Sequence, residues 1–230
     1  MSEQMITDED LEQEEKRTYA EQSKRISESI ARTKTMIDNV IKDKAVSEIL
    51  AGKGYDEAAM KEGLELQQQA SLAFQQRARA ISHQRMCTAT LRGKEETARQ
   101  MIADFRLSAR ALYQDQAALS ALSMMDHVPD ERSQFLNISR ASIRGAQQEP
   151  YAARFARYGY DTAMLDQITN ALDELDDADS TQNLAIKSAV ESTEARDLAH
   201  ERMDDWVKQF TKIATAALRH DPELLKVLEV

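Results

Sequence analysis

The chain contains few of the residues that interrupt helices or cross-link polypeptides. Its 230 residues include six glycines, three prolines and one cysteine, while 42% of them are hydrophobic. Scarce glycine and proline, together with abundant alanine, glutamate, glutamine, arginine and leucine, are typical of a chain that is helical almost throughout. The sequence therefore predicts an all-α fold.

Several kinds of reactive site lack the residues that they need. Cys87 has no second cysteine for an internal disulfide, and no Cys-x-x-Cys motif or Cys/His cluster is present to bind zinc. His83 precedes Cys87 by one helical turn, but no oxyanion-hole group accompanies the pair, so we interpret Cys87 as a packing residue. Gly52 and Gly54 flank a lysine without the Gly-Lys-Ser/Thr pattern of a phosphate-binding loop. We name no catalytic residue and expect no cofactor.

Long hydrophobic runs are also absent. No run approaches the roughly 18 apolar residues that a membrane-spanning helix needs. The opening residues MSEQMITDED have neither the basic nor the apolar region of a signal peptide. We therefore expect a cytoplasmic protein without membrane contact. The net charge of −10 argues against a nucleic-acid partner, because phosphate binding requires a basic surface.

Charges of each sign are concentrated in separate segments. Residues 1–15 and 161–179 each carry seven acidic residues and no basic one. A basic stretch lies between them: Arg77, Arg79, Arg85, Arg92, Lys94, Arg99, Arg106 and Arg110. These cations can pair with the 161–179 segment or face solvent. An anionic ligand between helices could instead be received by Arg77, Gln84 and Thr88, beside Arg85 and Arg92. All three interpretations stay open.

A short phrase, Gly-Tyr-Asp, occurs twice at a separation of 105 residues. The two copies are Gly54, Tyr55 and Asp56, and Gly159, Tyr160 and Asp161. In each copy we expect the glycine to end one helix in a left-handed conformation and the aspartate to cap the next helix. The tyrosine is expected to pack on the new helix as a hydrophobic staple. The phrase therefore predicts two structural corners rather than a binding site used twice.

The same offset keeps apolar residues elsewhere in register. Phe105 meets Phe210, and Ile102 meets Val207. This predicts two tandem repeats of three helices within one elongated bundle of long antiparallel helices. The predicted parts are an acidic N-terminal arm or helix extension at 1–25, repeat 1 at 26–125, a linker at 126–130 and repeat 2 at 131–230.

Apolar positions spaced by three and four residues continue from Leu165 to Ala217, which is typical of a coiled-coil seam. Gly93 predicts a helix reversal near 89–95 in repeat 1, and by analogy a second reversal near 194–200. A buried polar layer in the middle of the seam is the alternative. Pro150 is expected to kink or end a helix that begins near residue 131, which leaves a short piece from 151 to 157.

The most suggestive pair of side chains is Asp197 and His200. Three residues apart on a helix, they share a face, as do the carboxylate and histidine in half of a ferritin-like two-metal site. The matching position of His200 in repeat 1 is Glu95. Asp197, His200 and Glu95 are therefore the candidate metal ligands. A seam histidine bonded to a neighbouring carboxylate explains the same pattern without a metal.

The terminal segment HDPELLKVLEV and the pattern Gly-Tyr-x-x-x-x-Leu at the second corner carry a resemblance. In these features the chain resembles uncharacterised all-helical bacterial proteins of two-repeat layout. The resemblance implies no activity.

Long seams and segregated charge favour a non-enzymatic helical interaction or scaffold protein that forms a homo-oligomer or binds another protein. The alternative is a helical bundle that binds a metal or an anion through Asp197 and His200.

Overall fold

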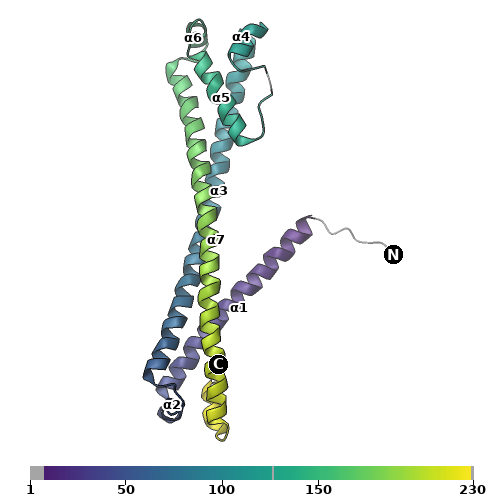
Figure 1. Cartoon of the computed structure of the whole chain (residues 1–230). Coiled ribbons are helices and arrows are strands. Elements are labelled where there is room, and N and C mark those ends of the chain that lie inside the picture. The colour runs from purple at the N-terminus through teal and green to yellow at the C-terminus, as the bar shows by residue number, and fades with distance from the viewer. Residues whose placement is uncertain (1–7, 126, 229–230) are drawn as a thin grey trace, which may run out of the picture. The chain divides into compact units, whose positions relative to one another are not determined.

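The computed structural model describes the backbone of residues 8–125 and 127–228, and the side chains from Ala20 onward within these ranges. The described residues form helices joined by short turns, and no strand occurs among them, so the all-α prediction is confirmed (Figure 1). The elements are α1 (Asp8–Lys42), α2 (Lys44–Ala51), α3 (Glu57–Leu112), α4 (Gln116–Ala121), α5 (Arg132–Ala146), α6 (Tyr151–Ala156), α7 (Thr162–Leu218), α8 (Pro222–Leu225) and a terminal 3-10 turn (Lys226–Leu228).

Two very long helices dominate the chain, and they correct one prediction. α3 is 56 residues long and α7 is 57 residues long, so the reversals predicted near 89–95 and 194–200 are wrong. A glycine inside a helix costs only about 1 kcal/mol relative to alanine, which is too little to end a helix that packs on both sides of it. The alternative of a buried polar layer fits better, because the seam holds Arg77 and Arg196 with exposed fractions of 5% and 2%.

The helices group into two compact units. Unit 1 is the described part of Met1–Ala80 and Ala189–Val230, and unit 2 is Ile81–Ser188. Each unit therefore draws residues from both predicted repeats, and α3 and α7 each contribute one part to either unit.

The core of unit 1 joins α2, the first part of α3 and the last part of α7. Tyr55, Trp206 and Phe210 form an aromatic group in which the Trp206 ring stacks on Phe210 with 5.2 Å between centroids. The edge of Tyr55 meets both rings, at 5.9 Å and 5.0 Å. Gly63 of α3 leaves the space that the Trp206 indole fills, since a Cβ atom there would lie 2.4 Å from the ring.

The core of unit 2 gathers aromatic residues around the short helix α6. Phe155 is fully buried, and its ring lies 5.3 Å from Phe105, 5.6 Å from Tyr113 and 6.3 Å from Tyr160. As Pro150 predicts, α5 has ended before this proline, and α6 begins directly after it.

Candidate functional site

Both Gly-Tyr-Asp phrases lie at corners of the same geometry. Gly54 and Gly159 have φ values of +92° and +88°, a region in which residues with a Cβ atom are strained. The Asp56 carboxylate accepts a hydrogen bond from the backbone N–H of Ala59 at 3.0 Å. The Asp161 carboxylate accepts the equivalent bond from Met164 at 2.9 Å. Each phrase therefore stops one helix and caps the next.

The tyrosines of the two corners face the cores of their units. The Tyr55 N–H donates to the carbonyl of Leu50 at 3.0 Å, and the Tyr160 N–H donates to that of Phe155 at 3.1 Å. These bonds satisfy carbonyls at the helix ends. Tyr160 also places its hydroxyl 3.0 Å from that of Ser108. The two corners thus share their backbone geometry and differ in what their side chains contact.

Substitutions at the corners test this geometry. We expect Asp56→Ala and Asp161→Ala each to lower the free energy of unfolding by about 1 kcal/mol, because a capping hydrogen bond is lost. Gly54→Ala and Gly159→Ala are expected to cost about 1 kcal/mol or more, because alanine is strained at positive φ. Chemical denaturation of the four variants measures these losses. If all four unfold like the parent chain, the corners do not stabilise the fold.

The candidate metal ligands Asp197 and His200 lie on α7 in unit 1. Arg196 donates two hydrogen bonds to one carboxylate oxygen of Asp197, at 2.8 Å and 2.5 Å. The third candidate, Glu95, belongs to unit 2 and accepts hydrogen bonds from Arg99 and Arg132 instead. Across the described residues, no three His, Cys, Asp or Glu side chains are grouped so that they could hold a metal ion.

A groove lies between α1 and α7 in unit 1. One part encloses about 620 Å³ and is lined by Gln22, Arg25, Ile26 and Ser29 of α1 and by Asp197, Leu198, His200 and Glu201 of α7. A second part of about 380 Å³ shares Arg25 and Ser29 with the first and continues to Met36 and Val207. The His200 Nε2 atom is shielded from solvent and makes no hydrogen bond to the described residues. Asp197 and His200 thus lie on one wall of this groove.

Two arginines of unit 1 are buried, Arg77 of α3 and Arg196 of α7, and Arg196 directly precedes the groove residue Asp197. Burial lowers the pKa of Arg77, the charge of Arg196 lowers it further, and the charge of Asp197 acts in the opposite direction. Two guanidinium groups therefore share the seam with a half-exposed carboxylate. Buried charges of this kind fix the register of paired helices more than they stabilise them.

The acidic segment 161–179 pairs mainly with arginines that the sequence analysis missed. Arg140 of α5 binds Asp173 at 2.7 Å and Asp176 at 3.0 Å, and Arg132 binds Asp179. Of the basic stretch, Lys94 pairs with this segment, through Glu174 at 2.6 Å. The missed signal was the eight-residue spacing of Arg132 and Arg140, which puts both on one face of a helix.

Other members of the basic stretch bind backbone carbonyls of the α4–α5 loop. Arg106 and Arg110 both donate to the carbonyl of Met124, at 3.3 Å and 3.1 Å. Arg99 donates to the carbonyls of Pro129 and Asp130 at 3.2 Å and 2.7 Å. These three arginines therefore hold the α4–α5 loop.

Glu95 is the centre of an ion-pair network in unit 2. Its carboxylate accepts from Arg99 at 2.9 Å and from Arg132 at 2.8 Å. Burial acts to raise the pKa of Glu95, but the hydrogen bonds and charges of the two arginines outweigh burial and hold the pKa below its ordinary value. A lowered pKa in the folded state means that Glu95 stabilises the fold at neutral pH.

This network predicts acid sensitivity. The contribution of Glu95 is fully present above the pKa of the unfolded chain, about 4.3, and is lost as the pH falls through the lower pKa of the folded state. We expect Glu95→Gln to destabilise the protein at pH 7. We also expect the variant to lose less stability than the parent chain between pH 5 and pH 3. Melting temperatures across this range measure the effect, with the exposed neighbour substitution Glu96→Gln as control. Parallel pH profiles for the parent and Glu95→Gln would contradict it.

Cys87 is buried in α3, and its sulfur lies 3.7 Å from Nε2 of His83. None of the described helices is both long and apolar enough to cross a membrane.

Comparison of the chain with protein-family models, curated proteins and solved structures finds no significant match.

Proposed function

We infer that the chain is a non-enzymatic helical interaction protein that assembles with copies of itself. The observation that carries this inference is the apolar surface of the two long helices. Large apolar side chains that are about half exposed or more occur along both: Leu72, Met86 and Leu107 of α3, and Leu184, Val190 and Leu198 of α7. Single exposed apolar residues are ordinary, but a series of them along two helices favours contact with further helices.

The proposal includes an architecture of two tandem repeats. α2, a Gly-Tyr-Asp corner, α3 and α4 follow one another in the same order as α6, the second corner, α7 and α8. α3 begins at Glu57 and α7 at Thr162, so the long helices begin 105 residues apart, as do the corners. This agreement of element boundaries supports duplication more strongly than the residue matches do.

An antiparallel pairing of α3 and α7 belongs to the same proposal. In unit 1, Gly63 lies against Trp206, and the charge of Arg196 helps to lower the pKa of Arg77, so residue numbers rise along α3 as they fall along α7. In unit 2 the ion pair of Lys94 with Glu174 fits the same order. Long antiparallel helices of this kind offer extended faces to a partner.

Light scattering after size-exclusion chromatography tests the proposed function. We expect a mass that is a multiple of 26.0 kDa for the untagged chain at micromolar concentration. A monomer at every concentration up to several hundred micromolar would count against self-association. We place this assembly in the cytoplasm, without nucleic-acid or membrane partners, and fractionation of cell extracts tests that placement.

Binding of a metal or an anion is the second candidate function. The groove between α1 and α7 favours an anion, because His200 lies on one wall and Arg25 on the other. A metal would use Asp197 and His200, which the described residues do not join to a third ligand. Elemental analysis of protein purified without chelator tests the metal, and calorimetric titration with inorganic phosphate tests the anion. Stoichiometric metal or saturable phosphate binding that His200→Ala abolishes would establish this function.

A further inference from the structure

Helix α1 begins 18 residues before the first of its described side chains that is buried. It begins at Asp8, but the first residue of α1 with a buried side chain among those described is Ile26, which joins Ile30, Ala70 and Met203. Figure 1 shows the preceding part of α1 (purple) extending away from α7. The 18 residues before Ile26 span about 27 Å. Helices in proteins draw most of their stability from the packing of one face rather than from helix propensity. From Ala20, where the described side chains begin, to Arg25, no side chain of α1 is buried.

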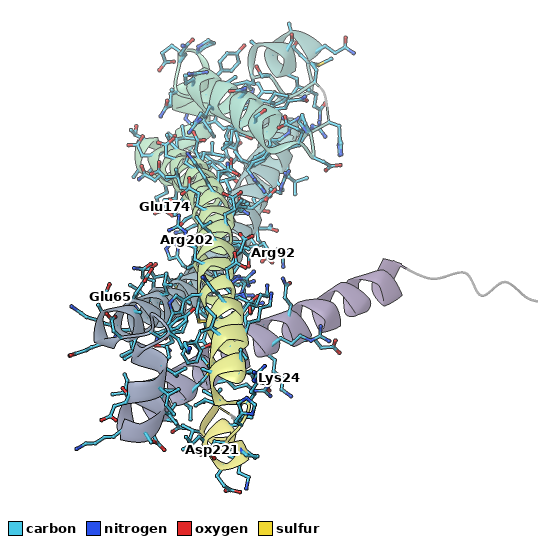
Figure 2. The ribbon with its side chains drawn as sticks, turned by 60° about the horizontal axis from the view of Figure 1, so that its bottom comes forward. Lys24, Glu65, Arg92, Glu174, Arg202 and Asp221 are labelled. Carbon is cyan, nitrogen blue, oxygen red and sulfur yellow. The ribbon has the colours of Figure 1, made fainter. Side chains whose placement is uncertain are left out.

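One stripe of α1 lines the groove that faces α7. Gln22, Arg25 and Ser29 line its larger part, and Arg25, Ser29 and Arg32 line the second part. These four positions follow the spacing of three, four and three residues that keeps a coiled-coil stripe on one face. Figure 2 labels Lys24, which neighbours this stripe on the same helix.

The stripe continues towards the N-terminus with opposite charge. Steps of four and three residues before Gln22 give Thr18, Glu15, Leu11 and Asp8. The whole stripe thus has two acidic positions, 8 and 15, before residue 20 and two basic positions, 25 and 32, after it. The charge of the stripe therefore changes from negative to positive at about residue 20.

Such a stripe is complementary to a second copy of itself in antiparallel orientation. When two α1 helices cross at residue 20, position 8 meets position 32 of the other copy, and position 15 meets position 25. The same register brings Leu11 opposite Ser29 and Thr18 opposite Gln22. A two-fold axis repeats every contact, so four pairs of opposite charge form in one isologous interface.

We propose that the N-terminal half of α1 from a second copy of this chain docks on the Arg25–Arg32 stripe, so that two α1 helices form an antiparallel pair. In this pair, the N-terminal half of each α1 packs on the C-terminal half of the other. Charge complementarity favours this occupant, because its acidic positions 8 and 15 meet Arg32 and Arg25 of the α1 stripe. The α7 wall of the groove carries Asp197 and Glu201, and Asp197 is already paired with Arg196. The proposal rests on the proposed self-association and names its interface.

A charge-exchange experiment on the full-length chain tests this pairing. The double substitution Arg25→Glu and Arg32→Glu should raise the dimer Kd in sedimentation equilibrium by about tenfold or more, because four attractive pairs become repulsive. Adding Asp8→Arg and Glu15→Arg restores opposite charges in the same register, and the Kd should return to within about threefold of the parent value. The matched control is Lys61→Glu with Arg79→Glu, exposed residues of α3 in unit 1. The control changes the net charge equally and should leave the Kd close to that of the parent.

The outcomes separate this inference from the proposed function. If the parent chain dimerises and the reversal of Arg25 and Arg32 acts no differently from the control, the inference is overturned and self-association stands. A reversal that weakens the dimer without rescue by the charge exchange also overturns the antiparallel register. A parent chain that is monomeric at every concentration overturns both proposals.

Discussion

Replacing Phe155 with alanine is expected to lower the free energy of unfolding by about 3–5 kcal/mol, the cost of deleting a buried aromatic ring. Phe155 is fully buried, and the rings of Phe105, Tyr113 and Tyr160 surround it at centroid distances of 5.3 to 6.3 Å. It is also the one residue of the six-residue helix α6 whose side chain is buried. Truncation therefore leaves a cavity and detaches α6 from the core of unit 2.

Tyr158, three residues away, provides the matched control. Its side chain is 63% exposed, so Tyr158→Ala removes an aromatic ring without opening a cavity. We expect Tyr158→Ala to change the free energy of unfolding by less than about 0.5 kcal/mol. Urea denaturation monitored by circular dichroism compares the two variants. Equal losses for Phe155→Ala and Tyr158→Ala would show that the aromatic cluster does not anchor α6.

The corners show what local sequence signals can predict. Gly54 and Asp56 act within a few residues of each other, since a left-handed glycine ends a helix and an aspartate caps the next backbone N–H groups. The same local rule describes the second corner. Helix ends and caps that depend on residues a few positions apart can be predicted from a single sequence, and so can a largely helical fold.

Gly93 shows where the same reasoning fails. A glycine is a stop signal only when packing does not hold the helix together, and the packing depends on residues far away in the chain. Leu91 and Ala98 are both buried in the core of unit 2, on either side of Gly93. Their burial favours a continuous α3 by more than the glycine costs, so the predicted reversal does not occur.

The sequence pattern also could not predict which cations pair with the acidic segment 161–179. The basic stretch from Arg77 to Arg110 and the acidic segment 161–179 are conspicuous, yet the arginines of α5 supply most of the cations for that segment. The composition shows that cations are present to pair with the acidic segment 161–179 of α7, but it does not show which helix faces that segment. That choice depends on how α5 packs beside α7 within unit 2.

The candidate groove required both kinds of information. The sequence singled out Asp197 and His200, but Gln22, Arg25 and Ser29 of the opposite wall lie more than 160 residues earlier. The charge pattern of α1 can be interpreted only when the buried face of the helix is known, and the structure shows that Ile26 and Ile30 lie on that face. The stripe that remains beside the groove is the one with reversed charge about residue 20.

Alanine at Gly63 is expected to destabilise the protein by about 2–3 kcal/mol, the upper part of the range for overpacking. The added Cβ atom would lie 2.4 Å from the Trp206 ring. The indole cannot withdraw easily, because it stacks on Phe210 with an angle of 3° between the rings and meets the edge of Tyr55. The clash therefore disturbs the whole aromatic group of unit 1.

Gly93 provides the matched control within the same helix. A Cβ atom there meets nothing within 4 Å, so Gly93→Ala is expected to stabilise α3 by about 0.5–1 kcal/mol through helix propensity alone. Gly63→Ala gains the same helix propensity, but the chain still loses stability if the clash of the added Cβ atom with Trp206 costs more than this gain. Combining Gly63→Ala with Trp206→Leu removes the clash, so the two losses should be less than additive. Thermal melts of the four variants measure these terms, and a Gly63→Ala chain as stable as Gly93→Ala would show that Trp206 moves aside without cost.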